Sequence, residues 1–312
     1  MSEAKKIKIL KNILGIFHRE GSQFLFHCPR CSHHKRKLSV NIEKNLFKCW
    51  VCDWSGRNIY RIVRRYGDYR LKKEWRSFSQ QVEISDFVEK LFGEKEVAVS
   101  STIELPTHFI SLANKNLPTT ALRPLNYLKS RGLTKADIVK WKIGYCTSGK
   151  FAGRVVVPSF SNCGGVSYFV ARSYDGNWRK YLNPTVSSDI IFNELYVDFD
   201  EDITLVEGVF DAIKAEHNCI PLLGSTLNEN SALFQQIVEN DSSVYLALDS
   251  DADKKTNKII DILLKYSIEI FRIDISPYKD VAEMPRQVFL ERKQSAVFLN
   301  SDNYLLSKII GI

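Results

Sequence analysis

The 312-residue sequence lacks any apolar run that could cross a bilayer, since its longest, such as VVVP and ITLV, are only a few residues long. Its basic start, MSEAKKIKILKNILGIF, carries no signal-peptide cleavage pattern. These absences exclude a membrane partner and indicate a cytosolic protein in a reducing compartment. In such a compartment paired cysteines hold metal more often than they form disulfides.

The sequence also lacks a complete nucleotide-binding P-loop. GYCTSGK, residues 144–150, matches most of that motif, but Phe151 stands where Ser or Thr would hold magnesium. The residues that follow have strand character, whereas a P-loop needs a helix there to present its N-terminus to phosphate. Hydrolysis of a nucleoside triphosphate at this motif is therefore not expected.

Acidic residues are scarce in the first quarter of the chain. Residues 1–76 contain nineteen Lys/Arg and six Asp/Glu, whereas residues 77–312 contain 25 and 30, so the net charge of +8 comes from the N-terminal part. Such a basic segment can simply be a solvated face. Combined with metal ligands and aromatic residues, it favours contact with a nucleic-acid backbone.

Two CxxC pairs lie in this basic segment, in the pattern C-x2-C-x17-C-x2-C. The spacing is typical of a zinc ribbon, in which the thiolates bind one structural Zn²⁺ tetrahedrally. Residues 38–42 and 46–49 predict a hairpin that carries the second pair back to the first. Because so small a module has little core, zinc would supply much of its folding free energy. The expected ligands are Cys28, Cys31, Cys49 and Cys52.

Three nearby histidines are alternative metal ligands: His27, His33 and His34. Ligation through His27, which directly precedes Cys28, would break the CxxC geometry. The other two are expected to face solvent or to contact phosphate, so we favour the four cysteines.

Aromatic residues flank the second cysteine pair. Trp50 and Trp54 could serve as lids over the small module. Alternatively, one of them, with Phe47 or Phe26, stacks on unpaired bases. Both interpretations stay open at this point, because stacking requires an exposed ring.

Beyond the cysteines, the pattern predicts an α/β protein with α+β elements. A basic helix is followed by a weakly patterned linker with one short helix from near Ser85. A mixed α+β segment then precedes an alternation of strands and helices, which implies a parallel sheet with helices on both faces. The predicted parts are 1–76 (zinc ribbon, nucleic-acid binding), 77–102 (linker), 103–200 (α+β subdomain), 201–290 (parallel sheet) and 291–312 (short tail).

Acidic side chains follow the strands of the predicted parallel sheet. Glu207 ends the strand in ITLVEGVFD, and Asp249 and Asp251 follow the strand in VYLALDSDAD. Because ligands bind beyond the carboxyl ends of such strands, we expect the three acids to converge. Carboxylates suit Mg²⁺ or Mn²⁺, and such a site can carry out in-line phosphoryl transfer. Each acid could instead cap a helix or end a solvated loop, but three aligned acids favour metal binding.

These elements, in this order, resemble the bacterial and phage DnaG-type primases. EGVFD and LDSDAD are similar to the two hallmarks of the Toprim domain, which primases share with topoisomerases and some nucleases. The ribbon is similar to the primase zinc-binding domain, although many members have histidine where Cys31 stands. YLKSRGLTKADIVKWKIGY is similar to the helical signature that opens the primase polymerase domain, and RVVVPSF, VARSY and KYLNP to its basic groove. The resemblance covers about residues 20–290.

The resemblance implies roles for particular residues. Asp211 would be an accessory acid of the catalytic site and a further Mg²⁺ or Mn²⁺ ligand, Asn183 would help to order the KYLN loop, and Ala282 stands where many members carry a second acid. The residues expected to hold template or nucleotide phosphates are Arg154, Arg172 and Lys180. The metal-dependent catalytic acids would be Glu207, Asp249 and Asp251, with Asp280 as a further metal ligand.

The implied activity is that of a DNA primase, a DNA-directed RNA polymerase. Such an enzyme joins ribonucleoside triphosphates into short primers on single-stranded DNA, with structural zinc and catalytic Mg²⁺ or Mn²⁺. The chain resembles a compact phage form without a helicase or helicase-binding domain, so we expect another surface to engage a replicative helicase and other replisome proteins. Its expected location is the cytoplasm of a bacterial or phage-infected cell.

Two other functions share part of these features. A Toprim-type nuclease would have the same acids, but the signature at residues 127–145 and the KYLN element argue against it. A non-catalytic replication factor that binds single-stranded DNA would keep the ribbon. Against that alternative stands the intact set of Glu207, Asp249 and Asp251.

Overall fold

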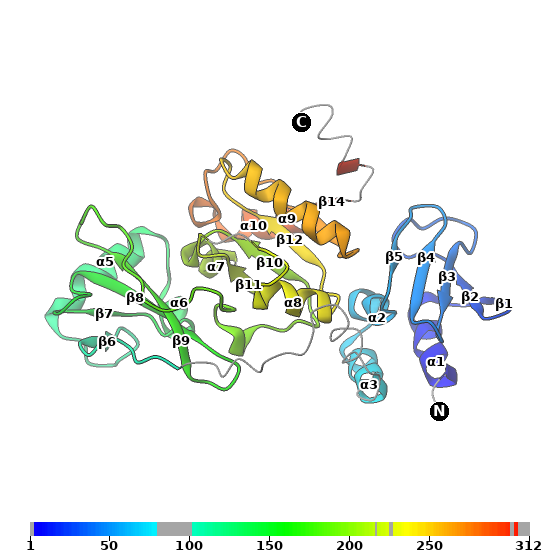
Figure 1. Ribbon diagram of the computed structural model, residues 1–312, viewed down its shortest axis with the longest axis horizontal. Helices are drawn as coiled ribbons and strands as arrows, with labels where there is room; N and C mark the ends of the chain where they lie inside the picture. Colours follow the sequence, from blue (N-terminus) through cyan, green and yellow to red (C-terminus); the bar gives the residue numbers. More distant parts are fainter. Residues whose placement is uncertain (1–2, 80–101, 216, 225–226, 300–302, 305–312) are drawn as a thin grey trace. The chain divides into compact units, whose positions relative to one another are not determined.

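The structure is a computed structural model that describes residues 3–79, 102–215, 217–224, 227–299 and 303–304 (Figure 1). The chain divides into two compact units, Met1–Lys95 with Val238–Ser242 and Glu96–Ile237 with Ser243–Ile312. The expected linker over 77–102, with its short helix near Ser85, lies almost wholly outside the described residues. Within the described ranges, none of the helices is both long and apolar enough to cross a bilayer.

The first unit contains a five-stranded antiparallel sheet in which the strands follow one another in chain order. Leu38 pairs with Cys49 in the third and fourth strands, and Asn45 makes the turn with a φ of 52°, so the predicted hairpin is confirmed. The strands are β1 (His18–Glu20), β2 (Gln23–Phe26), β3 (Leu38–Asn41), β4 (Leu46–Cys49) and β5 (Ser55–Gly56). Its helices are α1 (Glu3–Leu14), α2 (Tyr60–Tyr66) and α3 (Tyr69–Ser79).

The second unit begins with a four-stranded antiparallel sheet and, among its described residues, two α-helices and two short 3-10 helices. Gly132, with a φ of +70°, follows the first helix, and Thr134 caps the second through a capping box with Asp137. The segment after residues 144–150 leads into a strand rather than a helix, as predicted for a motif that is not a P-loop. The strands are β6 (Phe109–Ser111), β7 (Gly144–Cys146), β8 (Arg154–Phe160) and β9 (Val166–Ser173). The helices are η1 (Thr119–Ala121), α5 (Leu122–Ser130), α6 (Lys135–Lys140) and η2 (Glu194–Tyr196).

The same unit continues with a five-stranded sheet in the order β11-β10-β12-β13-β14, in which the first four strands are parallel. Because strand–helix–strand crossovers are right-handed, the reversal of direction after β11 places α7 on one face and α8 and α9 on the other. The strands are β10 (Ile203–Val206), β11 (Cys219–Pro221), β12 (Val244–Ala247), β13 (Ile270–Arg272) and β14 (Val297–Leu299). The helices are α7 (Val209–Ala215), α8 (Ala232–Glu239), α9 (Asp253–Lys265), η3 (Val281–Glu283) and α10 (Arg286–Gln294).

One hydrophobic core joins the two sheets of the second unit. Val206 and Phe271 from the parallel sheet lie in the same buried cluster as Leu128 of α5, Trp141 and Phe210 of α7. The loops at the carboxyl ends of the parallel strands are thereby held against the antiparallel part (Figure 1).

The parallel sheet extends beyond residue 290, where the sequence analysis placed a tail. Strand β14 pairs antiparallel with β13, with Phe271 opposite Phe298. A three-residue strand is too short to show an alternating pattern, so hydrophobic periodicity does not reveal it.

Candidate metal centre and candidate active site

The four cysteines of the first unit form one cluster. Their sulfur atoms all lie within 4.8 Å of one another, with Cys28–Cys52 and Cys31–Cys49 Sγ separations of 3.8 Å. A tetrahedral zinc with Zn–S bonds of about 2.3 Å has S–S edges of about 3.8 Å. The cysteines are free rather than disulfide-bonded. The cluster therefore fits one structural zinc ion.

Tight turns present these thiols. Ser32 follows the first CxxC pair with a φ of 50° and donates its N–H to the Cys28 carbonyl at 3.0 Å. Asp53 follows the second pair with a φ of 53°, and the Cys49 N–H bonds the Trp54 carbonyl at 2.7 Å. Each turn reverses the chain directly after its cysteines, so both thiols of a pair face the same point.

The nearby histidines are not part of the cluster. Among the described residues the ligand group contains only cysteines. The ring of His27 is exposed and its Nδ1 lies 3.3 Å from the carbonyl oxygen of His33. This geometry favours the four-cysteine assignment over the histidine alternatives.

Burial separates the two tryptophans of the ribbon. Trp54 is 1% exposed and packs with Phe47 at a centroid distance of 4.8 Å, and Phe26 is also fully buried. Trp50 is 65% exposed, and the Lys48 ammonium lies 4.9 Å from its ring centroid. Trp54, Phe47 and Phe26 are thus core residues, and only Trp50 has the exposure that base stacking requires.

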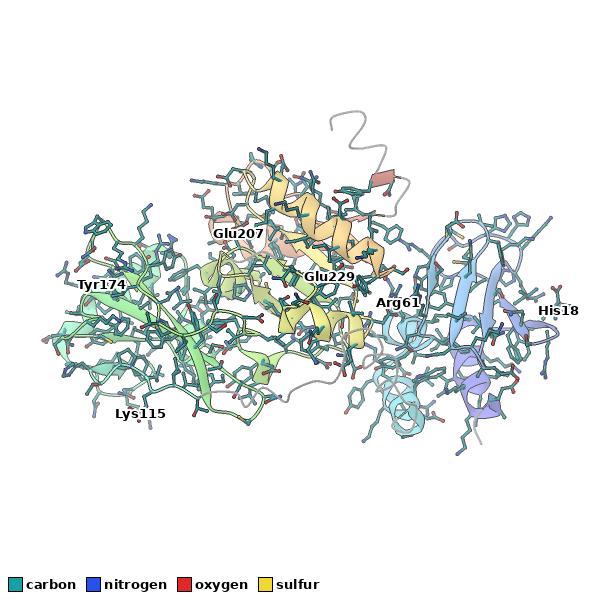
Figure 2. The ribbon with its side chains drawn as sticks, viewed as in Figure 1. His18, Arg61, Lys115, Tyr174, Glu207 and Glu229 are labelled. Atoms are coloured by element: carbon teal, nitrogen blue, oxygen red, sulfur yellow. The ribbon has the colours of Figure 1, made fainter. Side chains whose placement is uncertain are left out.

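A cavity of about 560 Å³ opens in the second unit at the carboxyl ends of the parallel strands. Its acidic residues come from the loops after β10 and β12, from α7 and from η3 with the residue that caps it. Its basic residues come from the C-cap of α5, from β9, from the loop after β9 and from the loop before η3. Figure 2 shows Glu207 on the parallel-sheet side of this unit. The charged lining residues are Arg131, Arg172, Lys180, Glu207, Asp211, Asp249, Lys279, Asp280 and Glu283.

Asp249 has the most crowded carboxylate of this wall. Burial, together with the negative charges of Asp211 and Glu207 and of other nearby acids, raises its pKa to about 7. Carboxylates this close to one another oppose ionisation. A bound cation would relieve that repulsion.

Asp211 is held by the backbone from both sides. Its Oδ2 accepts the Gly208 N–H at 2.9 Å and its Oδ1 accepts the Ala282 N–H at 2.8 Å. Burial is the main cause that raises the pKa of Asp211 to about 6. This side chain joins the turn after β10 to the loop of Asp280. Both oxygens of this expected metal ligand thus accept backbone N–H groups, a geometry typical of a positioning residue, and its role as a ligand stays a prediction.

Glu207 carries a partner that sequence reasoning missed. The Lys255 ammonium, from the first turn of α9, lies 3.1 Å from Glu207 Oε1, and both side chains are mostly buried. A lysine near the start of a helix gives no sequence signal for this pair, because its partner lies 48 residues earlier in the chain.

The other two predicted acids lie differently around the cavity. Asp280 lines it and caps η3 by accepting the Glu283 N–H at 2.9 Å. Asp251 is exposed on the loop after β12 and is not among the lining residues. Within the described ranges, no three carboxylates form a ligand group as tight as the cysteine cluster.

This donor set fits a divalent ion that shares its coordination with substrate. Mg²⁺ keeps several waters and takes further ligands from substrate phosphates, so a few spread carboxylates suffice. The like-charge crowding at Asp249 is the observation that favours such an ion.

Arg172 of β9 is the best-fixed cation of the basic wall. Its Nε donates to the Tyr127 hydroxyl at 2.9 Å and its Nη1 to the Tyr181 hydroxyl at 2.5 Å. Its guanidinium also lies over the Phe210 ring at 5.8 Å, as does that of Arg131 at 5.0 Å. Sequence reasoning found Arg172 but missed Arg131 and both tyrosines, although Tyr127 and Tyr181 stand inside the recognised motifs.

Arg154 does not line the cavity, in contrast to the expectation from its motif. It is buried, and its guanidinium donates to the carbonyl oxygens of Arg179 at 2.8 Å and Lys180 at 3.2 Å. In this structure Arg154 fixes the loop that presents Lys180, and its expected contact with phosphate stays a prediction. Asn183 lines the cavity, and its Oδ1 accepts the Ala171 N–H at 3.4 Å.

No protein-family model matches the chain. In sequence it is similar to the DNA primase of Thermotoga maritima, with 22% identity over 316 residues that cover 85% of this chain and 54% of the relative. In structure it is similar to the zinc-binding and RNA polymerase domains of the Aquifex aeolicus primase, with a TM-score of 0.50, 20% identity, and coverage of 94% of this chain and 83% of that one. A DnaG primase catalytic domain bound to single-stranded DNA matches with a TM-score of 0.50 and 16% identity over 58% of this chain and 74% of that chain.

The chain has the DnaG-type primase fold. The chain spans about half the length of the curated primases that it matches. The match to the Aquifex aeolicus chain covers both the cysteine cluster and the parallel sheet with acids at its strand ends.

Proposed function

We propose that the protein is a DNA primase, which joins ribonucleoside triphosphates into short RNA primers on single-stranded DNA. The observation that carries this proposal is the cavity with one acidic and one basic wall at the strand ends of a primase fold. Such a cavity can hold metal ions and polyphosphate together. The curated relatives named DNA primase support the same conclusion.

The proposed reaction is nucleotidyl transfer. The 3′-hydroxyl oxygen of one nucleotide attacks the α-phosphorus of the next, the bond from that phosphorus to the β-phosphate bridging oxygen breaks, and pyrophosphate leaves. The hydroxyl proton passes to solvent. Phosphoryl transfer of this kind depends on positioning and electrostatics rather than on a protein nucleophile.

We assign the ligands of the catalytic ions to Glu207, Asp249 and Asp280, with Asp251 joining from the exposed loop. Mg²⁺ or Mn²⁺ bound there would supply positive charge to the attacking oxygen and to the leaving pyrophosphate. Asp211 would keep Asp280 and Glu207 in register through its two backbone hydrogen bonds. The acids would thus remain fixed when substrate enters.

The basic wall would hold the phosphates. Arg172, oriented by two tyrosine hydroxyls, would face the substrate from β9, and Lys180 would reach it from the following loop. A guanidinium held by hydrogen bonds loses less side-chain freedom when it contacts phosphate. This wall would therefore position the triphosphate or the template backbone against the acids.

The zinc-bearing unit would bind the single-stranded template. Trp50 offers an exposed ring beside Lys48, the combination that single-stranded nucleic-acid sites use for stacking and phosphate contact. Engagement of a replicative helicase and of other replisome proteins stays a prediction.

The test is primer synthesis on single-stranded DNA with Mg²⁺ and labelled ribonucleoside triphosphates. Wild-type protein should make short RNA and Asp249→Ala should make none. Asp253→Ala, which removes an exposed acid that also follows β12, should retain synthesis. Metal-dependent DNA cleavage without RNA would replace the proposal with the nuclease. DNA binding without either reaction, with a replicative helicase present or absent, would favour the replication factor.

A further inference from the structure

Trp178 is the most exposed large apolar side chain in the described part of the chain, with 89% of its surface accessible. The other tryptophans of these residues, apart from Trp50, are core residues: Trp54, Trp75 and Trp141 are 1%, 2% and 6% exposed. A tryptophan without a packing role is a poor choice for a solvated loop, because its large ring gains most of its stabilisation from burial. Its exposure therefore points to a ligand.

The loop that carries Trp178 is built to hold its shape. The Asn177 N–H donates to Ser173 Oγ and to Asp175 Oδ1, both at 3.2 Å, and the Arg179 N–H donates to Asn177 Oδ1 at 2.9 Å. Side chains of Ser, Asp and Asn that bond nearby backbone groups fix tight turns in this way. The ring of Trp178 is thus presented by an ordered turn.

The end of this loop is held by hydrogen bonds from Arg154 and Ser173 to its backbone carbonyls. Arg154 donates to the carbonyl oxygens of Arg179 and Lys180, and the Ser173 N–H donates to the same Lys180 oxygen at 2.9 Å. The anchor uses backbone carbonyls, so it leaves the side chains of Trp178, Arg179 and Lys180 exposed to solvent.

This exposed stretch leads directly into the acidic and basic cavity. Lys180 and Tyr181 line the cavity together with Asp249, and the Lys180 N–H donates to the Trp178 carbonyl at 3.1 Å. Trp178 itself is not a lining residue. The tryptophan therefore stands at the approach to the cavity, two residues before its basic wall.

We propose that Trp178 is a stacking platform for an unpaired base of the single-stranded DNA template where the strand approaches the cavity. Arg179 and Lys180 would contact the phosphates on either side of that base. Aromatic rings interleaved with cations bind single strands without regard to sequence, because every base offers a π-face. An incoming ribonucleotide is the less suitable occupant, because its triphosphate would have to lie inside the cavity, away from Trp178.

This inference rests on the proposed function, since it assumes that a single strand enters the cavity. Its test is equilibrium binding, measured by the fluorescence anisotropy of a labelled oligothymidylate, rather than primer synthesis. The variants are Trp178→Ala, Trp178→Phe and the control Tyr196→Ala, which removes a half-exposed aromatic ring of the same unit that does not line the acidic cavity. Each variant is also measured on an abasic strand of equal length, which keeps the phosphates and lacks the bases.

On oligothymidylate, Trp178→Ala should weaken binding by about fivefold or more, which is the lower end expected for one base on one aromatic ring. Trp178→Phe should stay within about twofold of wild type because it keeps a π-face, and Tyr196→Ala should bind like wild type. On the abasic strand, wild type and Trp178→Ala should bind equally. In primer synthesis, Trp178→Ala should have the same KM for ribonucleotides as wild type.

Equal binding of wild type and Trp178→Ala to oligothymidylate would overturn the inference, as would no binding by wild type. An equal loss on the abasic strand would also overturn it, because the residue would then act through phosphates or loop structure. A raised ribonucleotide KM with unchanged DNA binding would assign Trp178 to the nucleotide instead. Base-dependent binding without primer synthesis would uphold the stacking role and refute the primase proposal.

Discussion

Replacing Asp249 by asparagine should stabilise the second unit at high pH when no divalent ion has been added. The carboxyl group has its pKa raised to about 7 from an ordinary 3.8 by burial and by neighbouring acids. At about 1.4 kcal/mol for each pKa unit, a shift of about three units limits the gain in unfolding free energy to about 4 kcal/mol. Because the side chain is only partly buried, solvent screening reduces the expected gain to about 1–2 kcal/mol.

The sign follows from the direction of the shift. The raised pKa means that the folded state keeps the proton longer than the unfolded state does, so the favourable contribution is complete below pH 3.8 and is lost as the pH rises through about 7. At pH 8 the charged Asp249 side chain is repelled by its neighbours in full, whereas a neutral asparagine at this position is not. The difference in unfolding free energy between them should therefore grow from pH 4 to pH 7 and stay constant above that.

Urea unfolding at pH 4.5 and pH 8 measures this difference, with hydrogen exchange of β12 peptides reporting on the second unit alone. Asp253→Asn is the matched control, because that exposed acid is paired with Arg272 and should change stability by less than about 0.5 kcal/mol at either pH. Added Mg²⁺ should stabilise wild type more than Asp249→Asn. A variant that is equally or less stable than wild type at pH 8 would refute the reasoning.

Three further changes test other contacts. Cys49→Ser should abolish zinc binding, measured by metal analysis, and exchange protection in β2–β4; retained zinc would contradict the ligand set. Lys255→Gln should lower the unfolding free energy by about 1 kcal/mol without added metal because Glu207 loses its cation, whereas Lys265→Gln, at an exposed pair, should cost under about 0.5 kcal/mol. Arg154→Met should cost about 2–3 kcal/mol and speed amide exchange in the loop after β9; unchanged exchange there would argue against the anchor.

Local patterns gave the parts of this structure that depend on neighbours in sequence. The CxxC spacing predicted the cysteine cluster because two residues between thiols already fix a turn. The cap at Thr134 was predictable because it depends on residues three apart in the sequence. The shared edge of the acids was predictable because parallel strands end at the same edge of a sheet.

The sequence could not reveal contacts that arise only when distant segments pack. Arg154 stands in a motif that suggests phosphate binding, yet its charge is used by carbonyl oxygens that lie 25 and 26 residues further along the chain. Lys255 meets Glu207 across 48 residues. Likewise, Trp50 and Trp54 have similar sequence surroundings, and only the path of the chain after Cys52 decides which ring is buried.

The anchor made by Arg154 separates the shape of the loop after β9 from its chemistry. Because the guanidinium binds peptide carbonyls, which every residue possesses, residues 179 and 180 can be exchanged without removing the bonds that hold them. Substitutions at these two positions could therefore change which strand or base the loop binds without moving the catalytic acids. The fold thus fixes the backbone of this loop and leaves its side chains free to vary. Template preference can therefore evolve without changing the catalytic acids.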